Sequence, residues 1–109
     1  MQYGRDAREV FLQAAGAARQ LGHSYVGSAH LLLALTKQRG MCGQLLRFAG
    51  LEPVFTEAVV CVLCGVGAPG LPLPQGFTPT ARQVLRNAGQ EASRWESRWV
   101  DSMHILLSL

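Results

Sequence analysis

Apolar side chains recur every three or four residues over residues 5–21, which is the pattern of a helix with one buried face. Many of these residues are alanines, so another helix can approach closely. Gly22 then suits the left-handed position that ends a helix. From Ser28 to about Gln38 the chain offers almost no polar face, so this second helix is expected to be buried on most sides. The Ser28 hydroxyl can accept from the free amides of the first turn, which predicts Ser28 as the N-cap.

Two shorter helices are predicted next, across residues 41–49 and 53–64. Pro53 fits the first position of the second one, because the amide that proline lacks would be unpaired there in any case. Residues 65–76 are predicted to be a linker, since their prolines and glycines exclude regular structure. Beyond the linker, Thr78 as N-cap and Pro79 at the first helical position mark the start of another helix.

The last third of the chain repeats the first third at a constant offset of 74 residues, the distance from Ala7 to Ala81. Roughly 33 positions align without a gap, and eleven of them are identical. The repeat divides a single domain over 1–109 into repeat one at 3–64 and repeat two at 77–109. The other identical pairs are Arg8 and Arg82, Val10 and Val84, Ala14 and Ala88, Ala18 and Ala92, Val26 and Val100, Ser28 and Ser102, His30 and His104, Leu32 and Leu106, Leu33 and Leu107, and Leu35 and Leu109.

Repeat two is incomplete. Its first helix is predicted from Pro79 to about Arg94 and its second from Ser102, but counterparts of the helices at 41–49 and 53–64 are missing. A leucine-rich helix in this position exposes apolar surface unless something covers it. We therefore expect the chain to be either part of a longer protein or a shortened member of its family that forms a dimer.

The composition narrows the class of protein. Apolar residues make up 49% of the chain and charged residues 16%, which is typical of a globular domain. The net charge of +3 is mild and the arginines are scattered, so nucleic-acid binding is unlikely; a small basic helical DNA-binding protein is the alternative function. The longest near-apolar run, residues 58–68, is too short for a membrane span. The absence of a signal-peptide pattern and the odd number of cysteines, three, favour the reducing cytoplasm.

Candidate chemistry at histidines and cysteines is weak. His30 and His104 occupy equivalent first turns of buried helices without further metal ligands or a nucleophile at suitable spacing, so a hydrogen-bonded structural role is expected. We expect the same of His23. Cys61 and Cys64 form a lone C-x-x-C at a helix C-terminus, the wrong end for lowering a thiol pKa. We predict that they and Cys42 are small apolar core residues. No catalytic residue, metal site or cofactor is predicted.

The doubled pattern resembles the N-terminal domain of the bacterial Clp ATPases of the ClpC and ClpA type. The most specific part is LGHSYVGSAHLLLAL at residues 21–35, which is similar to the family's LGHxxIGTEHLLLGL motif. The resemblance implies an all-α domain of two pseudo-twofold-related helical repeats, of which the second is incomplete here. It also implies a non-catalytic module that docks a protein substrate or adaptor for an AAA+ unfoldase. No Walker motif is present, so ATPase or protease activity would lie outside this chain.

Two positions depart from the family pattern. In the ClpC branch that binds phosphoarginine-tagged substrates, the acidic residue of the GTEH motif is expected to pair with the guanidinium. The matching residues here are Ala29 and Met103, which are uncharged and argue against phosphoarginine recognition. The threonine that follows the opening aromatic residue is kept as Thr78 but is Gly4 in repeat one.

The candidate binding residues lie at equivalent positions of the two repeats and on the turn at residues 95–99, whose sequence differs from the matching turn of repeat one. Docking is expected in a groove between the repeats. The alternative for the arginines is a solvated face or a helix-surface ion pair, and the alternative for the two opening aromatic residues is to staple the helix starts. Tryptophans on the diverged turn could form a second interaction patch, since Trp is enriched at binding hot spots. The predicted protein-binding residues are Tyr3, Arg8, Phe77, Thr78, Arg82, Trp95 and Trp99.

Overall fold

A computed structural model describes residues 2–65 and 76–109. The first helix, α1, spans Arg5–Gln20 and buries the predicted alanine-rich stripe. It ends at Leu21, and Gly22 follows with a φ of 72°, a left-handed conformation that favours glycine. The helix predicted over 5–21 is therefore confirmed, together with the residue that ends it.

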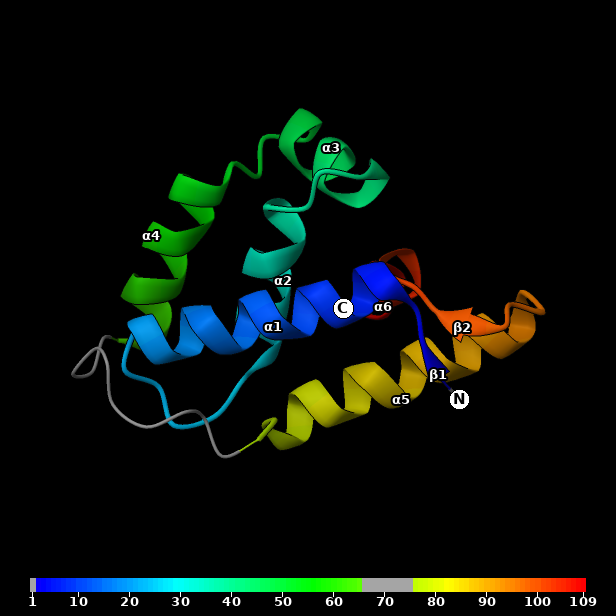
Figure 1. Ribbon diagram of the computed structural model, residues 1–109. Helices are drawn as coiled ribbons and strands as arrows, with labels where there is room; N and C mark the ends of the chain where they lie inside the picture. Colours follow the sequence, from blue (N-terminus) through cyan, green and yellow to red (C-terminus); the bar gives the residue numbers. More distant parts are fainter. Residues whose placement is uncertain (1, 66–75) are drawn as a thin grey trace.

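The second helix, α2, spans Ser28–Thr36 and is the centre of the fold (Figure 1), because α1 and all the later helices pack against it. Leu31, Leu33 and Leu35 are fully buried, as the absence of a polar face predicts. The predicted N-cap is wrong. Gly27 occupies the cap position, and the imidazole of His30 accepts the hydrogen bond from its amide, so the Ser28 hydroxyl is not used as the cap.

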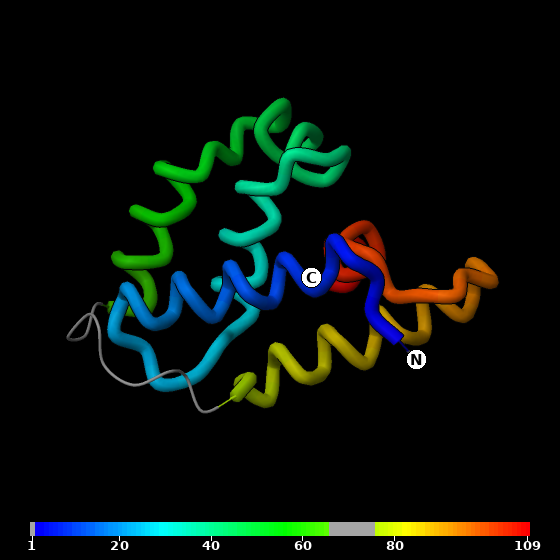
Figure 2. The backbone as a smooth tube through the Cα atoms, in the orientation of Figure 1, coloured from blue at the N-terminus to red at the C-terminus, as the bar shows by residue number. Residues whose placement is uncertain are grey.

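The next two helices turn away from α1. Helix α3 spans Met41–Phe48 and helix α4 spans Pro53–Cys64, with Pro53 in the first turn as predicted. Gly65 ends α4 with a φ of 75°. Both helices pack on α2, and Figure 2 shows them rising together on one side of the molecule.

Helix α5 spans Pro79–Arg94 and helix α6 spans Ser102–Ser108. The Thr78 hydroxyl accepts a hydrogen bond from the Ala81 amide at 3.1 Å, which confirms the predicted N-cap of α5. Helix α5 packs chiefly on α6, as α1 packs chiefly on α2. The linker predicted at 65–76 lies almost entirely outside the described residues, apart from its two end glycines.

The sequence pattern did not predict a short parallel sheet. Strand β1, Gln2–Tyr3, pairs with strand β2, Trp99–Val100, and a single bridge joins Val26 to Phe77. The two pairings are equivalent under the 74-residue offset, since Tyr3 meets Val100 as Phe77 meets Val26. The opening segment of each repeat thus pairs with the segment before the second helix of the other repeat. These two equivalent pairings relate the repeats in a pseudo-twofold arrangement.

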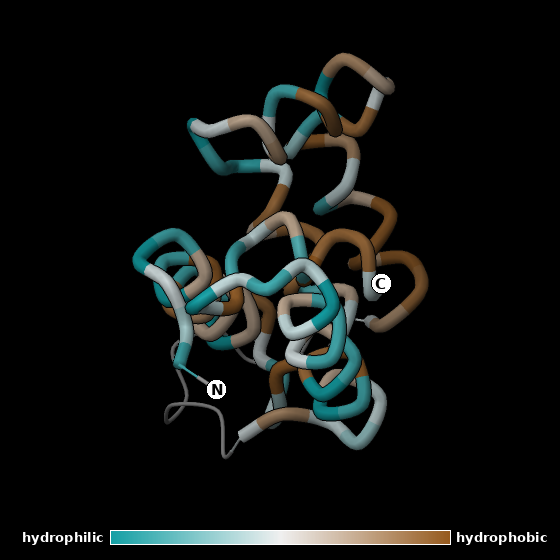
Figure 3. Tube along the Cα trace, turned by 90° about the vertical axis from the view of Figure 1, so that its right-hand side faces the viewer, coloured by the Kyte–Doolittle hydropathy of each residue, from teal (hydrophilic) through white to brown (hydrophobic). Residues whose placement is uncertain are grey.

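One apolar core runs through α1, α2, α5 and α6. Figure 3 shows hydrophobic segments close to the C-terminus as well as inside the molecule. Cys42 is buried in this core, as predicted, but Cys61 is only half-buried and Cys64 is exposed. The prediction of a core role for the C-x-x-C pair is therefore wrong for Cys64, because the last three residues of α4, 62–64, are all exposed.

Candidate protein-docking site

Three aromatic rings line up across the junction between the repeats. The rings of Tyr3 and Phe11 meet edge to face with centroids 4.8 Å apart, and those of Phe11 and Phe77 meet at 5.8 Å. Tyr3 and Phe77 are the equivalent opening residues of the two repeats, and Phe11 on α1 lies between them. The structure therefore brings the two predicted aromatic residues to one place through a third that the sequence pattern did not single out.

An apolar groove of about 490 Å³ begins at this row of rings. One wall is α1 and the other is the segment around the Val26–Phe77 bridge. Leu12 in the wall is 74% exposed, and Arg8 is its charged rim. We call this the apolar groove; it is lined by Arg8, Phe11, Leu12, Ala15, Val26, Gly76 and Phe77.

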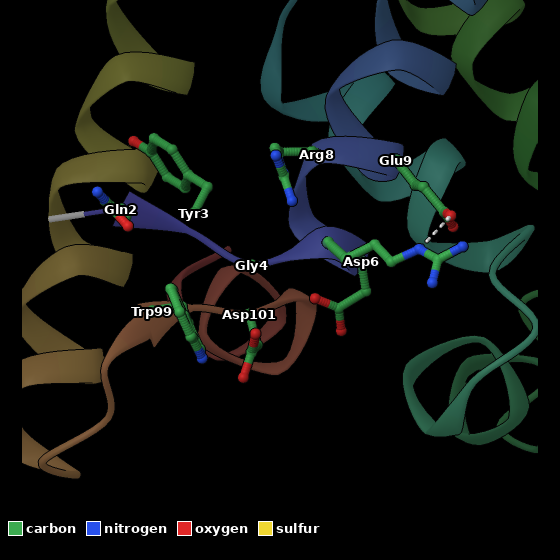
Figure 4. A pocket seen from close by; sticks show the side chains of 9 residues that line it. Gln2, Tyr3, Gly4, Asp6, Arg8, Glu9, Trp99 and Asp101 are labelled. Atoms are coloured by element: carbon green, nitrogen blue, oxygen red, sulfur yellow. Dashed lines mark ion pairs between the residues drawn. The ribbon is translucent and has the colours of Figure 1, made fainter.

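A second pocket of about 670 Å³, which we call the polar pocket, shares Arg8 with the apolar groove and is lined mostly by polar and charged residues (Figure 4). Arg5 and Glu9 on its rim form an exposed ion pair at 4.0 Å, which contributes little to stability. Asp101 lines the same pocket with its carboxyl pKa raised, first by burial and second by the nearby charge of Asp6. Charges of both signs therefore face this pocket.

The two halves of the pseudo-twofold differ beside this pocket. In one half, Gly27 leaves room for Thr78, whose methyl group would lie 3.6 Å from a Cβ at position 27. In the other half, the carboxylate of Asp101 occupies the space that any side chain at Gly4 would need. The loss of threonine at position 4 and the presence of aspartate at 101 are thus sterically coupled, and a carboxylate replaces a hydroxyl.

A third hollow of about 790 Å³ lies between α1, α3 and α6. Trp95, Met103 and Leu107 contribute apolar surface to it, and charged residues of both signs line it as well, among them Lys37, Arg39, Asp6 and Glu9. Met103, one of the two residues that replace the family's acidic position, therefore contributes apolar surface here.

The predicted binding residues separate into groups. Arg8 and Phe77 line the apolar groove, while Tyr3 and Trp99 line the polar pocket and Trp95 lines the third hollow. Thr78 is engaged as a helix cap, and Arg82 is exposed on α5 outside these three hollows. The two tryptophans thus line different hollows. The sequence analysis did not identify Leu12. The available signal was that Leu12 is apolar although it lies outside the buried stripe of α1.

The histidines make structural hydrogen bonds. The Gly27 amide donates to Nδ1 of His30 at 2.8 Å, so Nε2 of the neutral ring carries the proton and donates to Nδ1 of His23 at 2.7 Å. Nε2 of His23 in turn donates to the Gly65 carbonyl at 2.8 Å. Burial and, second, the nearby His23 lower the pKa of His30 from 6.5 to about 4.

In repeat two, the equivalent histidine, His104, makes only the hydrogen bond at Nδ1. The Asp101 amide donates to Nδ1 of His104 at 2.9 Å, but Ser97 stands where the offset places a partner for Nε2. Among the described residues, Nε2 of His104 is buried without a hydrogen-bond partner. The Trp95 ring covers this imidazole edge to face, with centroids 4.8 Å apart. Trp95 is therefore part of the packing around His104 as well as an exposed surface residue.

A buried polar contact joins Ser102, Asp6 and Cys42. Ser102 donates to Asp6 at 2.8 Å and its oxygen lies 3.3 Å from the Cys42 sulfur. Burial raises the pKa of the Cys42 thiol, which opposes formation of a nucleophilic thiolate. Across residues 2–65 and 76–109, no group of three or more metal-ligating side chains gathers, and no helix is long and apolar enough to cross a membrane.

Comparison with known proteins gives a family for this architecture. Residues 2–109 match the family model described as the Clp repeat (R) N-terminal domain. The chloroplastic chaperone protein ClpC3 of Oryza sativa subsp. japonica is 36% identical over 104 residues, which are 94% of this chain and 11% of that protein. The chloroplastic chaperone protein ClpC of Pisum sativum is 29% identical over 109 residues, 99% of this chain and 12% of that protein. The chain thus spans about a tenth of these curated relatives.

Solved structures show the same fold. The N-terminal domain of ClpD from Arabidopsis thaliana superposes with a TM-score of 0.77 at 19% identity, covering 98% of this chain and 74% of that one. The Hsp104 N-terminal domain from Candida albicans gives 0.75 at 23% identity, covering 99% and 73%. The family match over residues 2–109, together with this shared fold, establishes that the chain belongs to the Clp N-terminal repeat domains, the all-α family that its doubled motif resembles.

Proposed function

We propose that this chain is a non-catalytic protein-binding module of a Clp chaperone system, and that it docks an extended apolar segment of a substrate or adaptor in the apolar groove. The observation that carries the proposal is the groove itself. Leu12, Phe11 and Phe77 present apolar surface at the junction of the repeats, where nothing in the described residues covers it.

The chemistry of the groove favours an apolar segment over a charged one. The groove is lined mainly by hydrophobic side chains, and Arg8 provides the charge at its rim. Burial of apolar surface supplies most of the free energy of such docking, so binding should depend weakly on salt. A nucleic-acid partner would instead give binding that weakens steeply as salt rises.

The wider setting is also a proposal. The matched region is a small part of the ClpC relatives, so unfolding and proteolysis would reside in other domains or in partner proteins. The free cysteines at 42, 61 and 64 fit a reducing compartment such as the cytoplasm; the two relatives are named as chloroplastic. Phosphoarginine is not the ligand we propose, because Ala29 and Met103 cannot pair with a guanidinium.

The test is the binding of fluorescein-labelled, dephosphorylated β-casein, an unfolded protein, measured by fluorescence anisotropy. The variant Leu12→Glu places a charge in the apolar groove without disturbing the core, since Leu12 is 74% exposed. We expect its Kd to rise by about tenfold or more, which corresponds to roughly 1.4 kcal/mol.

The matched control is Val62→Lys, a charge placed on a residue of α4 that is 83% exposed and lies outside the apolar groove. This variant should bind casein like the unmodified chain. Equal binding by Leu12→Glu and the unmodified chain, or the absence of casein binding altogether, would contradict the proposal.

A further inference from the structure

The C-x-x-C pair lies in the exposed last turn of α4. Cys64 is exposed and Cys61 is half-buried, and both are free thiols. The residues between and beside them at the end of the helix, 62–64, are all exposed. Cys42, the third cysteine, is 3% exposed and lies in the core. A small oxidant in solution can therefore reach the pair on α4 but not Cys42.

Helical spacing brings Cys61 and Cys64 within reach of a disulfide. Side chains three residues apart in a helix are neighbours on the same side of it. The rise and radius of an α-helix separate their Cα atoms by about 5 Å. This separation lies inside the range of about 4.4–6.8 Å that the Cα atoms of a disulfide span.

The Cβ atoms of the pair must come closer for the bond to form. They are about 5–6 Å apart at this spacing in a regular helix, whereas a disulfide requires about 3.5–4.5 Å. The last turn of α4 must therefore tighten. The turn can do so at low cost, because its side chains are exposed and the helix ends directly before Gly65, whose amide donates to the Cys61 carbonyl at 3.0 Å.

A tertiary hydrogen bond connects this turn to the rest of the molecule. Nε2 of His23 donates to the Gly65 carbonyl at 2.8 Å, and Nδ1 of His23 accepts from His30 on α2 at 2.7 Å. Figure 1 shows this end of α4 beside the turn that follows α1. Because Gly65 is the residue after Cys64, a tighter last turn displaces the carbonyl that His23 binds.

We propose that Cys61 and Cys64 are a redox-modification site, at which a small disulfide such as oxidised glutathione forms a reversible bond between them and so releases the end of α4 from His23. Neither cysteine lines the apolar groove, so this inference does not depend on the proposed docking of substrates.

The chemistry is thiol–disulfide exchange. The thiolate of the exposed Cys64 attacks one sulfur of oxidised glutathione, whose S–S bond breaks, and the first glutathione leaves as a thiolate. The thiolate of Cys61 then attacks the Cys64 sulfur of the mixed disulfide and displaces the second glutathione. The two cysteines lose two electrons and two protons in all, and the two glutathione molecules gain them.

The first experiment exposes the 109-residue chain to oxidised glutathione and then alkylates the remaining thiols in denaturant. Intact mass spectrometry should show a product lighter than the reduced chain by two hydrogen atoms. After alkylation, peptide mapping should find the alkyl group on Cys42 alone, and excess reduced glutathione should restore alkylation of all three cysteines. Cys64→Ser should not form this product, whereas Cys42→Ala, the matched control, should form it as the unmodified chain does.

The second experiment tests the connection to His23. The disulfide equilibrium is measured across ratios of reduced to oxidised glutathione, with circular dichroism to verify the fold. His23→Ala removes the hydrogen bond that opposes displacement of Gly65. Its equilibrium constant for disulfide formation should therefore be about two- to tenfold larger, the factor that one hydrogen bond supplies. In the unmodified chain, oxidation should shift the imidazole NMR resonances of His23 and leave those of His104 on α6 unchanged.

Two sets of results would overturn the proposal. The modification site is wrong if all three cysteines remain open to alkylation in oxidised glutathione, or if the disulfide includes Cys42 or joins two chains. The release of α4 is wrong if His23→Ala forms the disulfide no more readily than the unmodified chain, or if oxidation leaves the His23 resonances in place.

Discussion

The imidazole of His30 shows how one residue holds two neighbouring segments. It accepts the amide proton of Gly27 at the start of α2 and donates to His23 in the turn after α1. The hydrogen bond from His23 to Gly65 continues the connection to the end of α4. Only neutral rings satisfy all three bonds, since a second proton on either imidazole would place two donors face to face.

This arrangement predicts a loss of stability in mild acid. The pKa of His30 is lowered from 6.5 to about 4, so the unfolded chain binds the proton more readily than the folded chain. The contribution of the neutral His30 ring to the free energy of unfolding is complete above pH 6.5 and is lost as the pH falls toward 4. The total loss is on the order of 3 kcal/mol. Urea unfolding at several pH values should show this decline, and His30→Gln should make it shallower.

Thr78→Ala is the control for the pH experiment. It removes the N-cap of α5 and should lower the free energy of unfolding by about 1 kcal/mol at every pH, since no titrating group is lost. If the free energy of unfolding of His30→Gln falls with decreasing pH as steeply as that of the unmodified chain, the acid sensitivity does not arise from His30.

At the scale of helices, two glycines inside helices have opposite roles. Gly16 lies on the exposed side of α1, where an added Cβ would meet nothing within 4 Å. Gly43 lies in α3, where an added Cβ would collide with the backbone carbonyl of Gln38. That carbonyl also accepts a hydrogen bond from Arg47 at 3.0 Å, so the connection between α2 and α3 is fixed in place.

The matched substitutions Gly16→Ala and Gly43→Ala should therefore change stability in opposite directions. The first should raise the free energy of unfolding by about 0.5–1 kcal/mol, because alanine restricts the unfolded chain and favours the helix. The second should lower it by roughly 1–3 kcal/mol, because α3 must move away from Gln38. Chemical denaturation of both variants tests this, and a stabilising Gly43→Ala would mean that α3 packs less tightly than the structure shows.

At the scale of the whole molecule, a buried polar contact joins the two repeats. Ser102 at the start of α6 donates to Asp6 near the start of α1, and it also contacts Cys42 on α3. Asp6 and Ser102 are 96 residues apart in the chain, so this contact holds repeat two against repeat one.

Ser102→Ala should lower the free energy of unfolding by about 1–3 kcal/mol, because it removes the hydroxyl that donates to Oδ2 of Asp6 and contacts the Cys42 thiol. Ser97→Ala is the control, since the Ser97 hydroxyl donates to the Trp99 carbonyl in a solvent-accessible turn and should matter by less than about 0.5 kcal/mol. Chemical denaturation measures both values. Equal effects of the two substitutions would show that the buried contact does not stabilise the molecule more than the exposed one.

The sequence by itself determined the helices, because they depend on local signals. The spacing of alanines set α1, the run of leucines set the buried α2, and Thr78 with Pro79 set the start of α5. The 74-residue offset also determined that the two opening aromatic residues are equivalent. The cap of α2 was missed, because an imidazole three residues into the helix took the role expected of the Ser28 hydroxyl.

The candidate site was decided by tertiary structure. Leu12 and Phe11 belong to the groove only because the Val26–Phe77 bridge lies against α1, and that bridge joins segments about 50 residues apart by pairing across the repeats. The exposure of Leu107 and Leu109 follows the leucine-rich pattern of the last helix, but which side of α4 faces outward could not be predicted, because it depends on how α4 packs on α2. Local propensity determines where a helix begins and ends, whereas the packing of distant segments determines which of its faces remains available to a partner.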